Sequence, residues 1–171
     1  MLFRSSINPM EIDSDLIRLI AETEKLCSHL HIPLQSGDDA ILKAMRRNYN
    51  RSQYLEVVQR AITAIPGLGR ATDVIVGFPG ETEEGFENTR KLIEQLPFSY
   101  LHVFSYSPRR GTEAYQLKDD VPGNLKKQRN QNLTQLANHK AFKLRENFLR
   151  QQEIVLRSEE HTSELQSRAY L

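Results

Sequence analysis

The stretch that decides the fold is Thr72-Asp-Val-Ile-Val-Gly-Phe-Pro-Gly-Glu-Thr82. Its first half is nearly continuous in Val and Ile, as is typical of a strand that is covered on both faces. Pro79 and Gly80 then turn the chain, and the Thr82 hydroxyl can cap a following helix. A buried strand that leads directly into a helix is typical of parallel sheets with helical crossovers.

Short apolar runs and longer amphipathic stretches alternate on both sides of this segment. Strands are predicted at residues 2–7, 29–33, 72–78 and 101–106. Helices are predicted from about residue 13, around 41–45, at 54–65 and at 82–96, followed by a long polar helix at 125–156. This order indicates about four parallel strands with right-handed crossovers. An open doubly wound sheet and part of a β/α barrel both satisfy it, and periodicity does not separate them.

Composition excludes several classes of protein. With 39% hydrophobic and 26% charged residues, the 171-residue chain resembles an ordinary one-domain globular protein, neither disordered nor fibrous. It has no run of about 18 apolar residues and no apolar leader, so we expect no membrane span and no secretory signal. Cys27 is the only cysteine, so the chain cannot supply the about four ligands of a structural zinc or iron–sulfur site. We expect a cytoplasmic protein without a metal of its own.

Polar and glycine-rich loops follow three of the predicted strands, at residues 33–38, 77–82 and 106–112. Ligands of parallel β/α folds bind at this end of the strands. Glycine lets the backbone approach a ligand closely, and Gln, Ser and Thr side chains offer hydrogen bonds that orient it. One such loop could consist of turn residues alone. Three loops at the same edge favour a shared ligand site.

Three longer stretches resemble the radical S-adenosylmethionine (SAM) methylthiotransferases. They are residues 29–49, beginning His29-Leu-His-Ile-Pro-Leu-Gln-Ser-Gly-Asp38, the stretch 72–82 quoted above, and Leu101-His-Val-Phe-Ser-Tyr-Ser-Pro-Arg-Arg-Gly-Thr112. They occur in the order and spacing of that family, over roughly residues 2–140. Within the family they are most similar to the enzyme that acts on threonylcarbamoyladenosine in tRNA. The isopentenyladenosine enzyme is the close alternative, and the ribosomal-protein enzyme fits less well.

The resemblance implies an α/β fold with the last four strands of a partial (β/α) radical SAM barrel. In such enzymes one [4Fe–4S] cluster cleaves SAM and a second cluster delivers sulfur, while the protein orients the cofactor and excludes water. Carried over to this chain, the resemblance places SAM beside Gln35, Ser36, Asp73, Gly77, Glu81, Tyr106 and Ser107. Basic residues next to these loops would face tRNA phosphates: Arg46, Arg47, Arg109 and Arg110. No catalytic or metal-binding residue is assigned to this chain.

Several of these residues have a simpler interpretation. Asp73 could end a strand by accepting a backbone hydrogen bond. His29 and His31 share a strand face, but without a third ligand nearby we expect packed or hydrogen-bonded histidines. Glu81 opens a helix, where acids complement the helix dipole, so a general-base role is not expected. The basic residues of the last helix are expected to keep its surface in water: Lys126, Lys127, Arg129, Lys140, Lys143, Arg145 and Arg150.

The chain departs from the family at both ends. The Cys-x-x-x-Cys-x-x-Cys motif should precede Leu2 and is absent, as are an N-terminal cluster domain and a C-terminal RNA-binding barrel. We therefore expect the iron–sulfur clusters only in a full-length parent, with the missing cluster domains and tRNA as partners, and no catalysis by this chain alone. The stretch from Arg157 to Ser167 resembles the translation of a common sequencing-library adapter, a natural polar tail being the alternative.

The predicted organisation thus has three parts: residues 1–124 form the half-barrel, residues 125–156 a helix leading towards the missing RNA-binding domain, and residues 157–171 an adapter-derived artefact. Two other interpretations remain open at this stage. One is a standalone module that binds tRNA or a partner protein, with the half-barrel as its scaffold. The other is an unrelated β/α enzyme, such as a phosphate-binding barrel.

Overall fold

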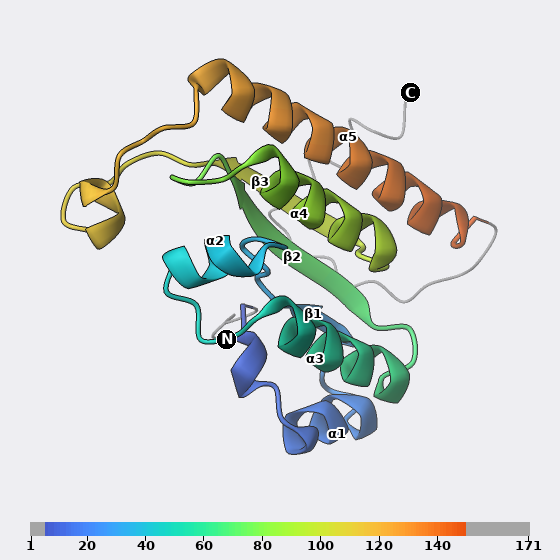
Figure 1. Ribbon diagram of the computed structural model, residues 1–171. Helices are drawn as coiled ribbons and strands as arrows, with labels where there is room; N and C mark the ends of the chain where they lie inside the picture. The colour runs from blue at the N-terminus through green and yellow to red at the C-terminus, as the bar shows by residue number, and fades with distance from the viewer. Residues whose placement is uncertain (1–5, 150–171) are drawn as a thin grey trace.

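Three parallel strands form the centre of the fold in the computed structural model, which describes residues 6–149. The strands are β1 (His29–His31), β2 (Gly69–Val76) and β3 (Tyr100–Ser105), in the order β1-β2-β3. The central strand pairs in parallel with both neighbours, as strands joined by helical crossovers do. The predicted α/β class with a parallel sheet is therefore confirmed (Figure 1).

Only the end of the predicted strand at 2–7 lies in the described part of the chain. Ser6 forms a parallel bridge with His31, and the Ile7 N–H donates to the His31 carbonyl at 3.0 Å. The chain before α1 therefore pairs with the outer edge of β1, where the strand predicted at 2–7 belongs. Residues 2–5 of that strand, residues 150–156 of the predicted last helix and the predicted tail at 157–171 lie outside the described residues.

Helices connect and flank the strands close to the predicted positions. They are α1 (Ser14–Glu22), α2 (Asp39–Ala44), α3 (Arg51–Ala64), α4 (Glu83–Gln95) and α5 (Gly123–Glu146), with 3-10 turns η1 (Pro9–Glu11) and η2 (Glu113–Gln116). Side-chain caps precede the first four α-helices: Asp13, Asp38, Asn50 and Thr82. Helix α3 begins at Arg51, earlier than the apolar pattern predicts, because Asn50 and Gln53 form a capping box.

The sheet is covered on one face and largely open on the other. In Figure 1, α3 and α4 lie against one side of the sheet, and α5 runs beside β3. The β2 side chains towards the helices are buried: Thr72, Val74 and Val76. The side chains of the other face are half-buried or exposed: Asp73, Ile75, Tyr100, His102 and Phe104. Within residues 6–149 no helix covers the second face of β2. The prediction that the strand at 72–78 is covered on both faces is therefore wrong.

A close backbone approach holds the loop after β1 against α4. The Gly37 N–H donates to the Thr89 hydroxyl at 2.9 Å. A Cβ atom on Gly37 would lie 2.6 Å from the Thr89 Cα, so a larger residue would force the backbones apart. The Ser36 hydroxyl lies 3.3 Å from the same Thr89 oxygen. These contacts fix the loop that carries Gln35.

Replacement of Gly37 by alanine should lower the free energy of unfolding by about 1–3 kcal/mol, because the added methyl group overpacks the contact with α4. Gly123→Ala is the matched control, since a Cβ there meets nothing within 4 Å and Gly123 opens α5. We expect no loss of stability from the control. Urea unfolding followed by circular dichroism measures both variants, and equal stabilities would contradict the close approach.

Candidate functional site

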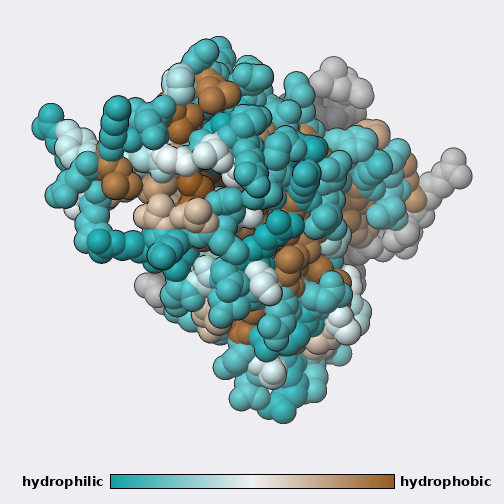
Figure 2. Space-filling model, viewed as in Figure 1, coloured by the Kyte–Doolittle hydropathy of each residue, from teal (hydrophilic) through white to brown (hydrophobic). Residues whose placement is uncertain are grey.

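A cleft of about 1160 Å³ opens at the C-terminal ends of β2 and β3. The loop after β1, the end of α2 and the β3–α5 connection with η2 complete its lining. Figure 2 shows the surface hollowed beside the η2 loop, with hydrophobic side chains visible in the hollow. The apolar part of the lining includes Met45, Ile75, Phe78, Phe104 and Leu117. The cleft therefore combines an apolar wall with polar groups from three strand ends, as ligand sites commonly do.

Four of the seven residues predicted to lie beside SAM line this cleft: Gln35, Asp73, Tyr106 and Ser107. Gln35 has φ 67°, in the left-handed region. Its N–H donates to the Asp73 carbonyl at 2.8 Å, and its carbonyl accepts from the Ile75 N–H at 2.9 Å. Backbone pairing with β2 thus holds Gln35 at the edge of the cleft.

The other three predicted residues lie behind the cleft: Ser36, Gly77 and Glu81. The Ser36 side chain is fully buried and accepts a hydrogen bond from the Asp38 N–H at 3.2 Å. Gly77 is buried at φ 72° and packs against the stem of Lys126. In this arrangement these residues support the lining from behind.

Glu81 is the buried anchor of the β2–α4 loop. Its Oε2 accepts from the Gly77 N–H at 2.8 Å and from the Arg129 guanidinium at 2.7 Å. The Glu81 and Arg129 side chains are 1% and 3% exposed. Burial raises the pKa of the Glu81 carboxyl, and the Gly77 amide and Arg129 oppose that rise. Glu81 precedes the Thr82 cap of α4, so it does not open the helix, contrary to the expectation from the sequence.

Asp73 faces the cleft from the middle of β2 and does not end the strand. Its Oδ1 lies 2.9 Å from the His31 Nε2, an ion-pair distance, although the contact does not meet hydrogen-bond geometry. The His31 Nδ1 lies 2.9 Å from the Ser6 hydroxyl. The interpretation of Asp73 as a strand-ending residue is therefore wrong, whereas His31 is hydrogen-bonded as expected.

Tyr106 and Phe78 form one wall of the cleft, with ring centroids 5.0 Å apart in an edge-to-face arrangement. The Tyr106 hydroxyl donates to the Ala114 carbonyl at 2.9 Å, which ties the wall to η2. On the other side, the Lys126 ammonium lies 5.1 Å from the centre of the Tyr106 ring. Burial, with the nearby Asp119 carboxylate, raises the pKa of Tyr106. The ring position is thus determined from both sides.

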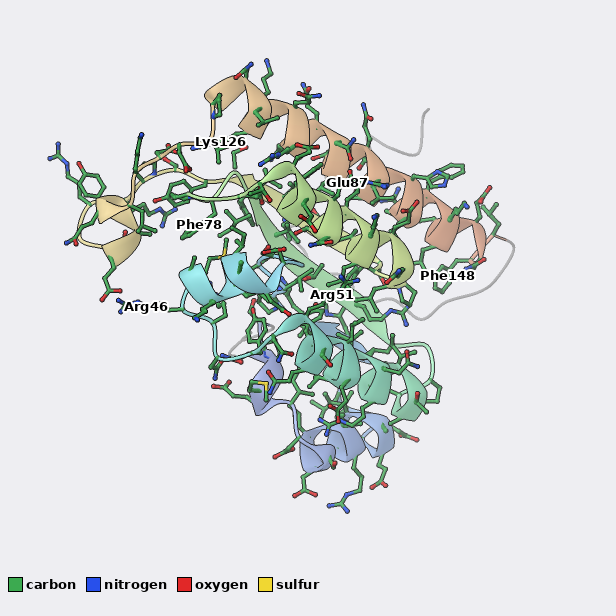
Figure 3. The ribbon with its side chains drawn as sticks, viewed as in Figure 1. Arg46, Arg51, Phe78, Glu87, Lys126 and Phe148 are labelled. Carbon is green, nitrogen blue, oxygen red and sulfur yellow. The ribbon has the colours of Figure 1, made fainter. Side chains whose placement is uncertain are left out.

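Three of the four arginines predicted to face tRNA line the cleft: Arg46, Arg47 and Arg109. Arg110 is exposed on the same connection but is not part of the lining. Arg46, at φ 57°, forms an ion pair with Glu113 of η2 (Figure 3). Both side chains of the pair are largely exposed, so water and salt weaken it and an incoming anion can compete for Arg46.

Two basic residues of α5 are buried, contrary to the expectation of a solvated helix surface. Lys126 and Arg129 share the inner face of α5 with Leu133. Their spacing of three and four residues places them on the same helix face. That spacing was visible in the sequence and could have marked them as inward-facing, but charge alone indicated solvent. The prediction for these two residues is therefore wrong.

Of the two cofactors expected in this family, SAM fits the residues of the chain and an iron–sulfur cluster does not. The cleft has the volume and the mixed lining that a nucleoside with an amino-acid tail requires. An iron–sulfur cluster does not fit, because the sequence contains one cysteine and Cys27 is exposed. Within residues 6–149, no three His, Cys, Asp or Glu side chains are arranged to hold a metal ion.

Comparison of the sequence with family models identifies the class of protein. The model described as the radical SAM superfamily matches residues 2–93, which is more than half of the chain. The chain therefore belongs to the radical SAM superfamily, which rules out the interpretation as an unrelated phosphate-binding β/α enzyme. Across residues 6–149, no helix combines the length and the hydrophobicity needed to cross a membrane.

Among curated proteins, the chain is similar to several called tRNA-2-methylthio-N(6)-dimethylallyladenosine synthase. The protein of Oceanobacillus iheyensis is 47% identical over 131 residues, which are 77% of this chain and 25% of that protein. The protein of Endomicrobium trichonymphae is 48% identical over 71% of this chain and 29% of its own length. The protein of Pseudomonas syringae pv. syringae is 46% identical over 80% of this chain and 31% of its own length. The chain thus spans about a quarter to a third of these relatives.

Solved structures agree on the fold. Coproporphyrinogen III oxidase (HemN) from Escherichia coli, a radical SAM enzyme, matches with a TM-score of 0.65 at 23% identity, over 79% of this chain and 31% of its own. The archaeal Elp3 of Methanocaldococcus infernus matches with a TM-score of 0.52 at 19% identity, over 65% and 26%. At these identities the likeness supports the predicted partial radical SAM barrel and nothing finer.

Glu81→Gln should lower the free energy of unfolding by about 3 kcal/mol, because it removes the buried counter-ion of Arg129 and leaves only the largely exposed Glu83 carboxylate as its partner. Glu84→Gln is the control, since Glu84 is exposed in the first turn of α4, three residues after Glu81, and should change stability by less than about 0.5 kcal/mol. Chemical denaturation measures both. A loss for Glu81→Gln no larger than that of the control would show that the buried pair contributes little.

Proposed function

We propose that this chain is the SAM-binding part of a tRNA methylthiotransferase that acts on an N6-dimethylallyladenosine, also called isopentenyladenosine. The observation that carries the proposal is the cleft, where Gln35 after β1, Asp73 within β2 and Tyr106 after β3 converge. Curated proteins named tRNA-2-methylthio-N(6)-dimethylallyladenosine synthase are 46–48% identical to this chain, which supports the choice of reaction. These names favour isopentenyladenosine, which was expected from the sequence only as the alternative substrate. The threonylcarbamoyladenosine that the sequence favoured gains no support from them.

The apolar lining is consistent with that substrate. Met45, Ile75 and Phe104 contribute hydrophobic surface to the cleft. A dimethylallyl group is a branched hydrocarbon, so burying it against such side chains is favourable. A threonylcarbamoyl group carries a carboxylate, which would need a cationic side chain of the cleft as its partner. Arg47 and Arg109 are available there, and under this proposal they meet tRNA phosphates instead.

When bound, SAM supplies one-electron chemistry at an unactivated C–H bond, with the help of an iron–sulfur cluster that this chain does not hold. The residues of this chain bind, orient and shield. Gln35 and Ser107 offer hydrogen bonds to polar groups of SAM, and Asp73 offers a carboxylate that is an acceptor for hydroxyl or ammonium donors. Phe78 and Tyr106 cover the nucleoside and keep water away.

The partners and the location follow from this proposal. The relatives are three to four times longer than the segment they share with this chain, so clusters and further RNA contacts belong to the longer protein. The cytoplasmic location expected from the sequence stays a prediction, in keeping with a tRNA substrate.

A second candidate is a binding module that takes up SAM or RNA without catalysis. The single cysteine of the sequence favours it for the chain acting alone, because no cluster can form. The two candidates differ when the chain is joined to the cluster-binding part of a relative. Methylthiolation of a dimethylallyladenosine-containing tRNA by the joined protein supports the first, and binding without product supports the second.

Removal of the Gln35 side chain should weaken SAM binding by about tenfold or more, as loss of a hydrogen bond to a charged or polar ligand does. Gln35→Gly is the suitable variant because glycine adopts φ 67° without strain. Isothermal titration calorimetry of the 171-residue chain with SAM measures the affinity. Gln59→Ala on α3 is the control, since Gln59 is exposed and does not line the cleft.

Unchanged affinity in Gln35→Gly would remove Gln35 from the SAM site. Loss of affinity in Gln59→Ala as well would indicate that the variants act through stability, and would equally contradict the assignment.

Charge removal at the mouth of the cleft should weaken RNA binding in a salt-dependent manner. Arg47→Gln and Arg109→Gln should each lower the slope of log K against log salt by about 0.7 for an anticodon stem-loop RNA, whose loop is single-stranded. Fluorescence anisotropy over a series of salt concentrations measures the slope. Arg18→Gln is the control, because Arg18 lies on α1 and pairs with Asp15. An equal change in the control would show that binding is not located at the cleft.

A further inference from the structure

We infer that Lys126 and Arg129 of α5 are positioning residues for the SAM cleft, holding the β2–α4 loop and the Tyr106 wall in place. This inference rests on the proposed function, since it concerns the site assigned to SAM. Neither residue lines the cleft. They act through residues that do, or through the backbone directly behind it.

Arg129 holds the loop through Glu81 and the start of α4. One of its amino groups donates to the Glu81 carboxylate at 2.7 Å and to the Glu81 carbonyl at 3.1 Å. The other donates to Glu83 at 3.0 Å. Glu81 in turn accepts the Gly77 N–H at 2.8 Å, so one guanidinium fixes both ends of the turn from 77 to 83. The Arg129 guanidinium also lies 5.3 Å from the centre of the Phe86 ring.

Lys126 holds the wall of the cleft. Its ammonium donates to both oxygens of Asp119, at 2.5 and 2.7 Å, and lies 5.1 Å from the centre of the Tyr106 ring. Its aliphatic stem covers Gly77 so closely that a Cβ there would lie 2.3 Å from the Lys126 Cγ. The labelled Lys126 and Phe78 lie near each other where β3 leads into the connection to α5 (Figure 3). One side chain therefore contacts the loop, the wall and the connection.

The connection before α5 completes the support. The Gly80 N–H donates to the Asp120 carboxylate at 2.8 Å, next to the Asp119 that Lys126 binds. The turn from 77 to 83 is thus held at Gly77, Gly80 and Glu81 by groups of α5 and its lead-in.

This support uses buried charge, which is an expensive way to gain stability. Glu81 Oε1 and Arg129 Nε are buried without a hydrogen-bond partner in the described part of the chain. Buried ion pairs are often no more stabilising than hydrophobic residues of the same volume, but they restrict geometry. A charged network behind a ligand loop is therefore better explained by the geometry it imposes than by stability.

The test replaces Lys126 with Ala, which removes both the aliphatic stem over Gly77 and the cation beside Tyr106. Two readouts are measured on the 171-residue chain: SAM affinity by calorimetry, and hydrogen exchange of the Gly77 amide by NMR. We expect SAM affinity to fall about tenfold and Gly77 exchange to rise by a similar factor, as for one lost charged hydrogen bond. The amide of Ile65, which donates to Ala61 in the core at 3.0 Å, should exchange as before. Lys126→Arg, which keeps a cation over Tyr106, should restore most of the affinity.

Lys127→Ala is the matched control, because Lys127 is the exposed neighbour on the same helix and should change neither readout. Equal acceleration at Gly77 and Ile65 would show a loss of global stability only and would overturn the inference. So would faster exchange at Gly77 with unchanged SAM affinity. If the unsubstituted chain does not bind SAM, the proposed function fails, while the exchange comparison still decides whether α5 holds the loop.

Discussion

The buried contact between the Glu81 carboxylate and the Arg129 guanidinium holds together the parts of this molecule that shape the cleft. It fastens α5 to the turn after β2, and through the Gly77 amide it determines how the central strand ends. The cleft depends on that ending, because Asp73, Ile75 and Phe78 reach it from β2 and the residues just beyond. A buried carboxylate without its partner would be costly, so the turn and α5 are constrained together.

Membership of the radical SAM superfamily explains why one face of the sheet is open. Side chains that face the interior of a β/α barrel are covered only when the sheet curves around them. Here three strands present His31, Asp73 and Phe104 on one face with no helix against them in residues 6–149. Ser6 and Ile7 already pair with the outer edge of β1, which is where further strands of a barrel would add.

Much of the fold was predictable, because strand and helix periods and capping residues are local signals. Thr82 and the apolar run before it correctly located β2 and α4, and residues of the three loops line one cleft as their shared edge predicted. The errors arose where tertiary contacts decide the outcome. Composition could not show that one face of β2 is open, that Asp73 meets His31, or that Glu81 has its partner 48 residues away on α5. Lys126 and Arg129 were assigned to solvent because charge is usually exposed, and only their partners make their burial tolerable.

The central claim is that SAM binds where Gln35, Asp73 and Tyr106 converge, and the most direct measurement maps the ligand onto the chain. SAM is titrated into the ¹⁵N-labelled protein and followed by two-dimensional NMR. The account predicts that the largest shifts occur at the amides of Gln35, Ile75, Tyr106 and Ser107, with small changes on α1 and α3. Shifts concentrated away from the ends of β2 and β3, or no saturable shifts at all, would contradict it.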